Sequence, residues 1–191
     1  MAFGNRHSAG TPWLPTGNPD TTNISSTDFN SMGGQPGGLG LRFEAANPAR
    51  TYQRVQLDSG ATASAPSGVV AANQVAYWKN KATYTVTNDS RFAMGGASAT
   101  TYRQQVAGIF RLAATAGNII DVCQVGQNIP VADGGNTFVA GDTVIAEADT
   151  TAAAANSINV GTAITSQVIG IARGAQAGGN VNVDIDIVGA E

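Results

Sequence analysis

The sequence has little of what most enzymes and metalloproteins depend on. Its 191 residues include one cysteine, Cys123, and one histidine, His7. A single cysteine excludes an intrachain disulfide, and one cysteine with one histidine offers no credible ligand set for zinc or iron. A Ser-His-Asp or Cys-His catalytic set would need His7 to be held rigidly, which Gly10 and Pro12 nearby disfavour. We therefore expect a protein that is not an enzyme, with no cofactor and no metal site.

Charge is scarce as well. Charged residues make up 12% of the chain, about half of the usual ~25%. Such a composition is typical of a protein that is packed against others. The net charge of −3 and the pI of 5.0 argue against a nucleic-acid partner, which would attract a basic surface.

The charges are unevenly placed along the chain. Residues 1–111 hold nine basic and five acidic residues, a net +4, whereas residues 112–191 hold one basic and eight acidic residues, a net −7. This asymmetry reflects either drift in composition or complementary regions that meet in neighbouring copies.

Long apolar runs are also missing. No segment reaches the ~18 apolar residues of a membrane span, and the first residues, MAFGNRHSAGTPW, have no apolar core of a secretory signal. We expect no membrane partner, and a protein that is assembled inside a cell.

Residues 1–48 differ from the rest in being dense in glycine, proline and small polar residues, as in GTPWLPTGNPDTTN and NSMGGQPGGLGL. Proline removes backbone donors and glycine loses entropy on ordering, so neither a helix nor a central strand is expected here. Large apolar side chains nevertheless interrupt the stretch. The combination predicts an extended arm that lies along a partner surface, with a disordered tail or a loop packed on its own domain as the alternative.

The arm supplies most of the candidate partner-binding residues, because aromatic and arginine side chains most often carry interface energy. The candidate anchors are Trp13, Leu14, Phe29 and Phe43, and the candidate charge-pairing groups are Arg6, Arg42 and Arg50.

From about residue 49 the apolar pattern has a period of two, which is typical of half-buried strands. The expected strands are 51–57, 73–78, 82–87, 106–112, 118–125, 142–148, 166–172 and 180–187. Glycine-rich turns separate them, including Asp133-Gly134-Gly135 and Gly178-Gly179-Asn180. Residues 150–157 are expected to form a loop or a single turn. We predict an all-β fold, in which residues 49–191 form a small antiparallel β-barrel or sandwich and residues 1–48 the arm.

One pair of acids could bind a cation. Asp184 and Asp186 share the polar face of the last expected strand. They are either Ca²⁺ ligands or the solvated or partner-facing side of that strand, and the second interpretation is favoured because no third acid is close in sequence.

The C-terminal half contains VAGIFRL, GQNIPV, FVAGDTVIAEADTTAAA and GTAITSQVIGIARGAQAGGNVNVDIDI in succession. This order of segments resembles the capsid decoration (cement) proteins of tailed bacteriophages. The matching elements are Gly141 to Ala146, Gly161 to Ile164, Val168 to Ala172 and Gly178 to Ile187. The resemblance covers roughly residues 106–189 and does not include the arm.

The resemblance implies a small β-barrel, often a homotrimer, on the outer surface of a viral capsid. Such a protein binds across neighbouring major capsid proteins and stabilises the shell, so the implied location is the virion, after assembly in the host cytoplasm. Three alternatives stay open. They are another virion component (a tail, fibre, head–tail or minor capsid protein), a carbohydrate-binding β module that uses Tyr77, Trp78 and Tyr102, and, least favoured, a hydrolase.

Overall fold

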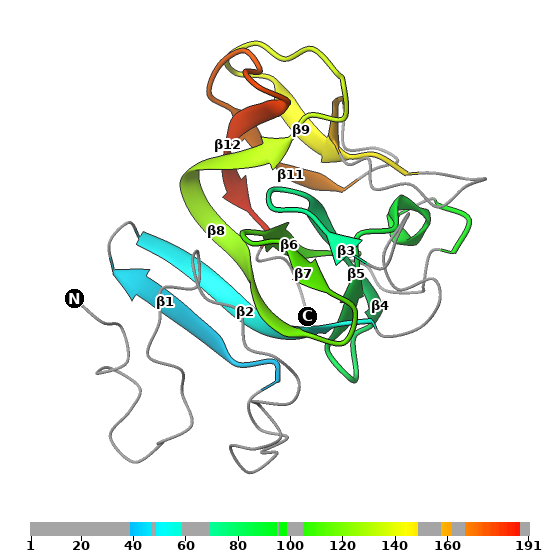
Figure 1. Cartoon of the computed structure of the whole chain (residues 1–191). Coiled ribbons are helices and arrows are strands. Elements are labelled where there is room, and N and C mark those ends of the chain that lie inside the picture. The colour runs from blue at the N-terminus through cyan, green and yellow to red at the C-terminus, as the bar shows by residue number, and fades with distance from the viewer. Residues whose placement is uncertain are drawn as a thin grey trace.

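The structure, a computed structural model, describes residues 39–46, 49–58, 69–94, 96–98, 105–148, 158–161 and 167–187. Regular structure in these ranges is almost entirely β, with one short 3₁₀ helix, η3 (Ser90–Phe92) (Figure 1). The strands are β1 (Arg42–Ala46), β2 (Ala49–Leu57), β3 (Val69–Val70), β4 (Val75–Asn80), β5 (Thr85–Thr87), β6 (Val106–Phe110), β7 (Ala114–Thr115), β8 (Ile119–Ala132), β9 (Thr143–Ala146), β10 (Ile158–Val160), β11 (Val168–Ala172) and β12 (Asn180–Asp186). The predicted all-β fold is confirmed.

Five strands close into a barrel in the order β2, β5, β4, β6 and β8, with β8 pairing back onto β2. Four of these pairings are antiparallel. The pairing of β2 with β5 is parallel, which the expectation of a purely antiparallel barrel did not include. Closure leaves no free edge between these strands.

Strand β8 is long enough to belong to two layers. Its first part closes the barrel, and its second part continues beyond the barrel to pair with β12, as Figure 1 shows. The pairing register of β12 with β8 shifts between Val183 and Ile185, and Asn128 in β8 has a positive φ of 56°. Such a bulge bends a strand and increases its twist. From β12 the second sheet continues through β11 and β9 to β10.

The two layers produce two apolar cores. The barrel interior holds side chains such as Val55, Trp78 and Phe110, whereas Tyr77 and Ile109 belong to the core that also contains side chains of the second sheet. Neighbouring residues of one barrel strand therefore point into different cores. This arrangement explains why all five residues of β6 are buried, although its alternating pattern predicted a half-buried strand.

The other sequence predictions can be compared strand by strand. Strand β12 alternates between buried and more exposed residues, as its sequence predicts. Strand β5 is shorter than expected, because Tyr84 has a positive φ of 54° in the preceding turn. The expected turn glycines Gly134 and Gly178 have positive φ. Residues 150–157 lie outside the described residues.

Residues 39–46, the described part of the range assigned to the arm, contain one strand. Strand β1 pairs with β2 alone and forms one end of the ten-stranded sheet, so it is an edge strand and not a central one. Residues 1–38 and 47–48, the remainder of the predicted arm, lie outside the described residues.

Candidate binding surface

The structure brings three of the seven candidate contact residues onto one pair of strands. Arg42 and Phe43 lie in β1, and Arg50 lies in the adjacent β2. The other four candidates lie outside the described residues: Arg6, Trp13, Leu14 and Phe29. The paired strands β1 and β2 are therefore the part of the predicted contact surface that can be examined directly.

Strand β1 presents two opposite charges on one of its faces. Arg42 and Glu44 are two residues apart, so their side chains leave the same face of the strand, and both are exposed. Within the described part of the chain, neither side chain has a hydrogen bond or an ion pair. The sequence analysis did not identify Glu44, because it assigned this stretch to an arm and not to a strand with alternating faces.

Arg50 is less available than Arg42. It is half-buried, and its aliphatic stem lies against Gly126 of β8. A Cβ added to Gly126 would come within 3.0 Å of the Arg50 Cγ. The stem of Arg50 thus packs on the sheet, a common arrangement for long charged side chains.

The chain just before β1 is fixed to the barrel. The Gly40 N–H donates to the Arg54 carbonyl at 2.8 Å, and the Arg54 N–H donates to the Leu41 carbonyl at 2.9 Å. The Gln53 Nε2 donates to the Gly40 carbonyl at 3.4 Å. We refer to residues 39–41 as the arm root, because the predicted arm joins the sheet there.

An aromatic pair completes the arm root. The ring of Tyr84 lies so close to Gly40 that a Cβ there would stand 2.2 Å from its Cζ. The same ring meets Trp78 edge to face, with centroids 6.3 Å apart and planes at 66°. Since Trp78 belongs to the barrel core, the arm root is connected to that core through Tyr84.

An open groove of about 490 Å³ lies where the start of β2, the bulge of β8 and the end of β12 meet. It is lined by Ala49, Val125, Gly126, Gln127, Asp184, Ile185 and Asp186. The Asp184 carboxylate accepts from the Arg173 Nε at 2.6 Å and from the Asn128 N–H at 2.9 Å. The hydrogen bond from Arg173, helped by the Asn128 amide, holds the pKa of Asp184 below its usual value.

The contacts of Asp184 with Arg173 and Asn128 bear on the possible Ca²⁺ site. One oxygen of Asp184 already accepts from a guanidinium and a backbone amide. The described residues contain no group of three or more His, Cys, Asp or Glu that could hold a metal ion. The contacts of Asp184 with Arg173 and Asn128 are those of a solvated or partner-facing strand face.

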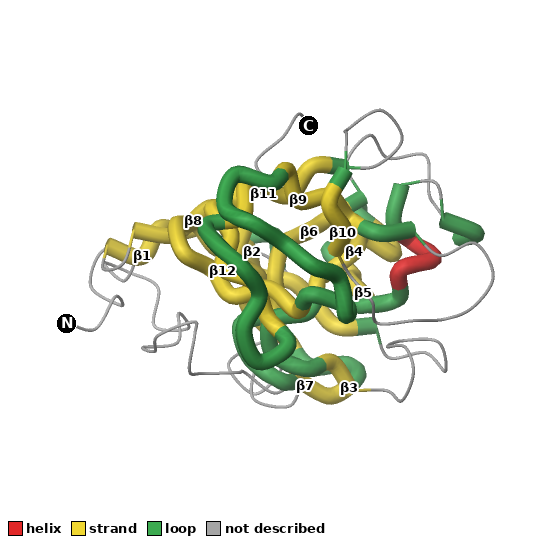
Figure 2. The backbone as a smooth tube through the Cα atoms, turned by 90° about the horizontal axis from the view of Figure 1, so that it is seen from above, coloured by secondary structure: helices red, strands yellow, loops and turns green. Residues whose placement is uncertain are grey.

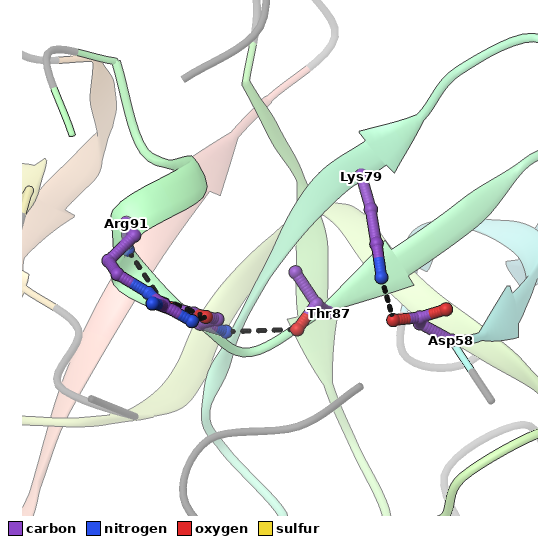
Figure 3. A network of polar contacts seen from close by, with 5 residues as sticks. Asp58, Lys79, Thr87 and Arg91 are labelled. Atoms are coloured by element: carbon purple, nitrogen blue, oxygen red, sulfur yellow. Dashed lines mark hydrogen bonds and ion pairs between the residues drawn. The ribbon is translucent and has the colours of Figure 1, made fainter. Parts of the chain in front are cut away.

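Two further ion pairs lie near the barrel strands β4 and β5. The Asp89 carboxylate accepts from the Arg91 Nε at 3.1 and 3.0 Å and from the Arg91 backbone N–H at 3.0 Å, and it caps η3. The Asp89 N–H donates to the Thr87 hydroxyl at 3.2 Å, and Lys79 forms an ion pair with Asp58 nearby (Figure 3). The Lys79–Asp58 pair joins β4 to the end of β2, whereas each contact of Asp89 is local, with a residue two positions away.

Two of the three aromatic residues offered for carbohydrate binding are buried. Tyr77 is fully buried and Trp78 is 2% exposed, whereas Tyr102 lies outside the described residues. Burial raises the pKa of Tyr77, and the charges of Glu147 and Asp89 raise it further. The expectation that Tyr77 and Trp78 serve as surface aromatics is therefore wrong, because the second layer covers one and the barrel encloses the other.

Comparisons with known proteins give a similarity to solved structures and none to known sequences. No protein-family model matches the sequence, and no curated protein matches it. The crystal structure of the head fiber gp8.5 N base of bacteriophage phi29 is similar with a TM-score of 0.41 and 12% sequence identity, over 73% of this chain and 98% of that chain. Within the described part of the chain, no helix has the length and apolar character needed to span a membrane.

Proposed function

We propose that the chain is a virion structural protein and, more specifically, a capsid decoration protein. In this role it binds the outer surface of the capsid across neighbouring major capsid proteins and stabilises the shell. The observation that carries the proposal is where the resembling segments lie in the fold. Gly141–Ala146, Val168–Ala172 and Gly178–Ile187 hold β9, β11 and β12, and these three strands are direct neighbours in the second sheet. Three of the four matching segments therefore lie side by side in one sheet, whereas VAGIFRL forms β6 of the barrel and most of Gly161 to Ile164 lies outside the described residues.

The arm root supports separate roles for the strand domain, which we call the body, and the arm. The hydrogen bonds of Gly40 with Arg54 and its contact with Tyr84 fix the position from which an arm extends. A strand body with an arm anchored at this point suits attachment to two neighbouring subunits at once. Repeated over a shell, modest contacts of this kind add a large total stability.

The proposed partners are the major capsid protein and other copies of this chain, as a homotrimer. The proposed location is the capsid surface of the virion, after assembly in the host cytoplasm. The low charge of the sequence, 12%, is typical of surfaces that are covered in an assembly.

Co-sedimentation with expanded capsids that lack this protein tests the proposal. The full chain should pellet with capsids and should raise the temperature at which they release DNA. A variant lacking residues 1–38 should bind more weakly. The truncation stops before the arm root because removal of residues 1–48 would also delete β1.

A full-length variant tests whether binding depends on the apolar side chains of the arm and not only on the presence of the arm. Replacing Trp13, Leu14 and Phe29 by serine should weaken capsid binding, whereas Val139→Ser should leave it unchanged. Val139 is a suitable control because it is 58% exposed on the body. Failure of the full chain to bind capsids would overturn the decoration role, and binding to purified tails instead would assign it to another part of the virion. Unchanged binding by the arm variants would overturn the arm assignment alone.

A further inference from the structure

The outer edge of β1 is open. Figures 1 and 2 place β1 at one extremity of the described strands, and it ends the strand order of the ten-stranded sheet. The Arg54 N–H donates to the Leu41 carbonyl, and backbone groups in an antiparallel ladder alternate in direction. The backbone groups of Arg42 and Glu44 therefore point away from β2. In the described part of the chain they have no partner.

The side chains at the same two positions carry opposite charges. Arg42 lies opposite Gln53, and Glu44 lies opposite Thr51, so β2 supplies no countercharge to either. Within the described part of the chain, this edge bears a cation and an anion two residues apart with no partner, and such an edge is complementary to a reversed copy of itself.

We propose that β1 pairs antiparallel with β1 of a second copy, with Arg42 opposite Glu44 of the second copy and Glu44 opposite its Arg42. Phe43 then lies on the two-fold axis, opposite its own equivalent. The contact is isologous, so the same short edge serves both copies.

The charges select this register from those that the backbone allows. Outward-pointing groups must pair with outward-pointing groups, which permits Arg42 opposite Arg42, Arg42 opposite Glu44, or Glu44 opposite Glu44. The first and third place like charges directly across from each other, which is destabilising. The second forms two ion pairs.

Charges on an edge strand also serve to prevent pairing with another chain. Whether they prevent pairing or select one register depends on whether they have the same sign or opposite signs. Charges of one sign repel a second copy in every antiparallel register, whereas Arg42 with Glu44 admits one register and disfavours its neighbours. The contact does not depend on the proposed capsid role. Because it is two-fold, on a shell it would join copies from two neighbouring trimers.

Sedimentation velocity of the full chain over a range of concentrations tests the inference by charge exchange. The parent should associate into species with twice the mass of the smallest one, and more weakly as salt rises. Arg42→Glu and Glu44→Arg should each weaken this step by at least about tenfold, since each replaces two attractive cross-strand pairs by two repulsive ones. The double variant Arg42→Glu/Glu44→Arg should restore it.

Two further variants guard against loss of folding and against general charge effects. Glu44→Pro removes an outward-pointing N–H without removing a bond to β2 and should also weaken association. Ala175→Arg introduces a charge at an exposed position between β11 and β12 and should have no effect on the two-fold step. Circular dichroism should show that each variant is folded. Absence of a doubling step in the parent, or failure of the double variant to restore it, would overturn the proposal.

Discussion

The ring of Tyr84 lies directly on the backbone of Gly40, so that a Cβ added to Gly40 would stand 2.2 Å from the ring Cζ. Gly40 also has a φ of +79°, in the left-handed region that favours glycine. We expect Gly40→Ala to lower the free energy of unfolding by about 2–4 kcal/mol, the sum of left-handed strain and overpacking against the ring. Urea denaturation of the full chain measures the loss.

A matched glycine separates the two causes. Gly135 has a similar φ of +86°, but nothing lies within 4 Å of where its Cβ would stand. Gly135→Ala should therefore cost only the backbone strain, about 1–2 kcal/mol. Equal losses in the two variants would show that the Tyr84 ring does not restrain the arm root.

Arg54 and Asp121 form a buried ion pair across β2 and β8. The Arg54 Nε lies 3.0 Å from one carboxylate oxygen of Asp121 and its Nη2 lies 3.2 Å from the other, and the side chains are 3% and 7% exposed. Asp121→Asn should destabilise the fold by about 3–5 kcal/mol, because it leaves the guanidinium buried without its countercharge. Thermal unfolding followed by calorimetry provides the measurement.

Replacing both partners tests whether the loss comes from the orphaned charge. The double variant Arg54→Met/Asp121→Leu should recover most of the stability, since apolar residues of similar volume often substitute well for a buried pair. A double variant as unstable as Asp121→Asn would indicate that Arg54 holds the barrel through its other contacts.

The sequence was sufficient to predict the burial pattern of strands that have one covered face. In β12, Val181, Val183 and Ile185 are buried while Asn182 and Asp186 are exposed, and the printed pattern NVNVDIDI predicts this directly. The pattern was misleading for β6, where a second layer covers the other face and buries all five residues. Periodicity reports polarity along a strand and carries no information on how many layers enclose it.

Contacts between residues far apart in the chain could not be predicted from the sequence. Arg54 and Asp121 are 67 residues apart, and the meeting of Gly40 with Tyr84 depends on a positive φ at a tyrosine, a conformation that bulky residues rarely adopt. For the candidate surface, the choice of Arg42 rested on residue type alone. That Arg42 lies beside Glu44 on an edge strand could be recognised only from the register of β1 on β2.

Phe138 lies outside the strands but fills the core between the barrel and the second sheet, where it is fully buried. Its removal should therefore loosen the contact between the two layers. We expect Phe138→Ala to cost about 3–5 kcal/mol, measured by urea unfolding. The adjacent Val139 is 58% exposed, and Val139→Ala should change stability by less than about 0.5 kcal/mol. A small effect of Phe138→Ala would mean that the second sheet is held by its strand pairings alone.

Asp184 should link stability to pH through Arg173. The hydrogen bond from Arg173, followed by that from the Asn128 amide, holds the pKa of Asp184 below its ordinary value of 3.8. A carboxyl whose pKa is lower in the folded state adds stability that is fully present above the unfolded-state pKa and is lost as the pH falls through the folded-state pKa.

Arg173→Gln should raise the pKa of Asp184 in an NMR titration. The stability difference between parent and variant should be constant above about pH 5 and should shrink on further acidification. Because both side chains are partly exposed, at 45% and 39%, high salt should reduce this difference. A difference that grows on acidification would contradict the pairing of Asp184 with Arg173.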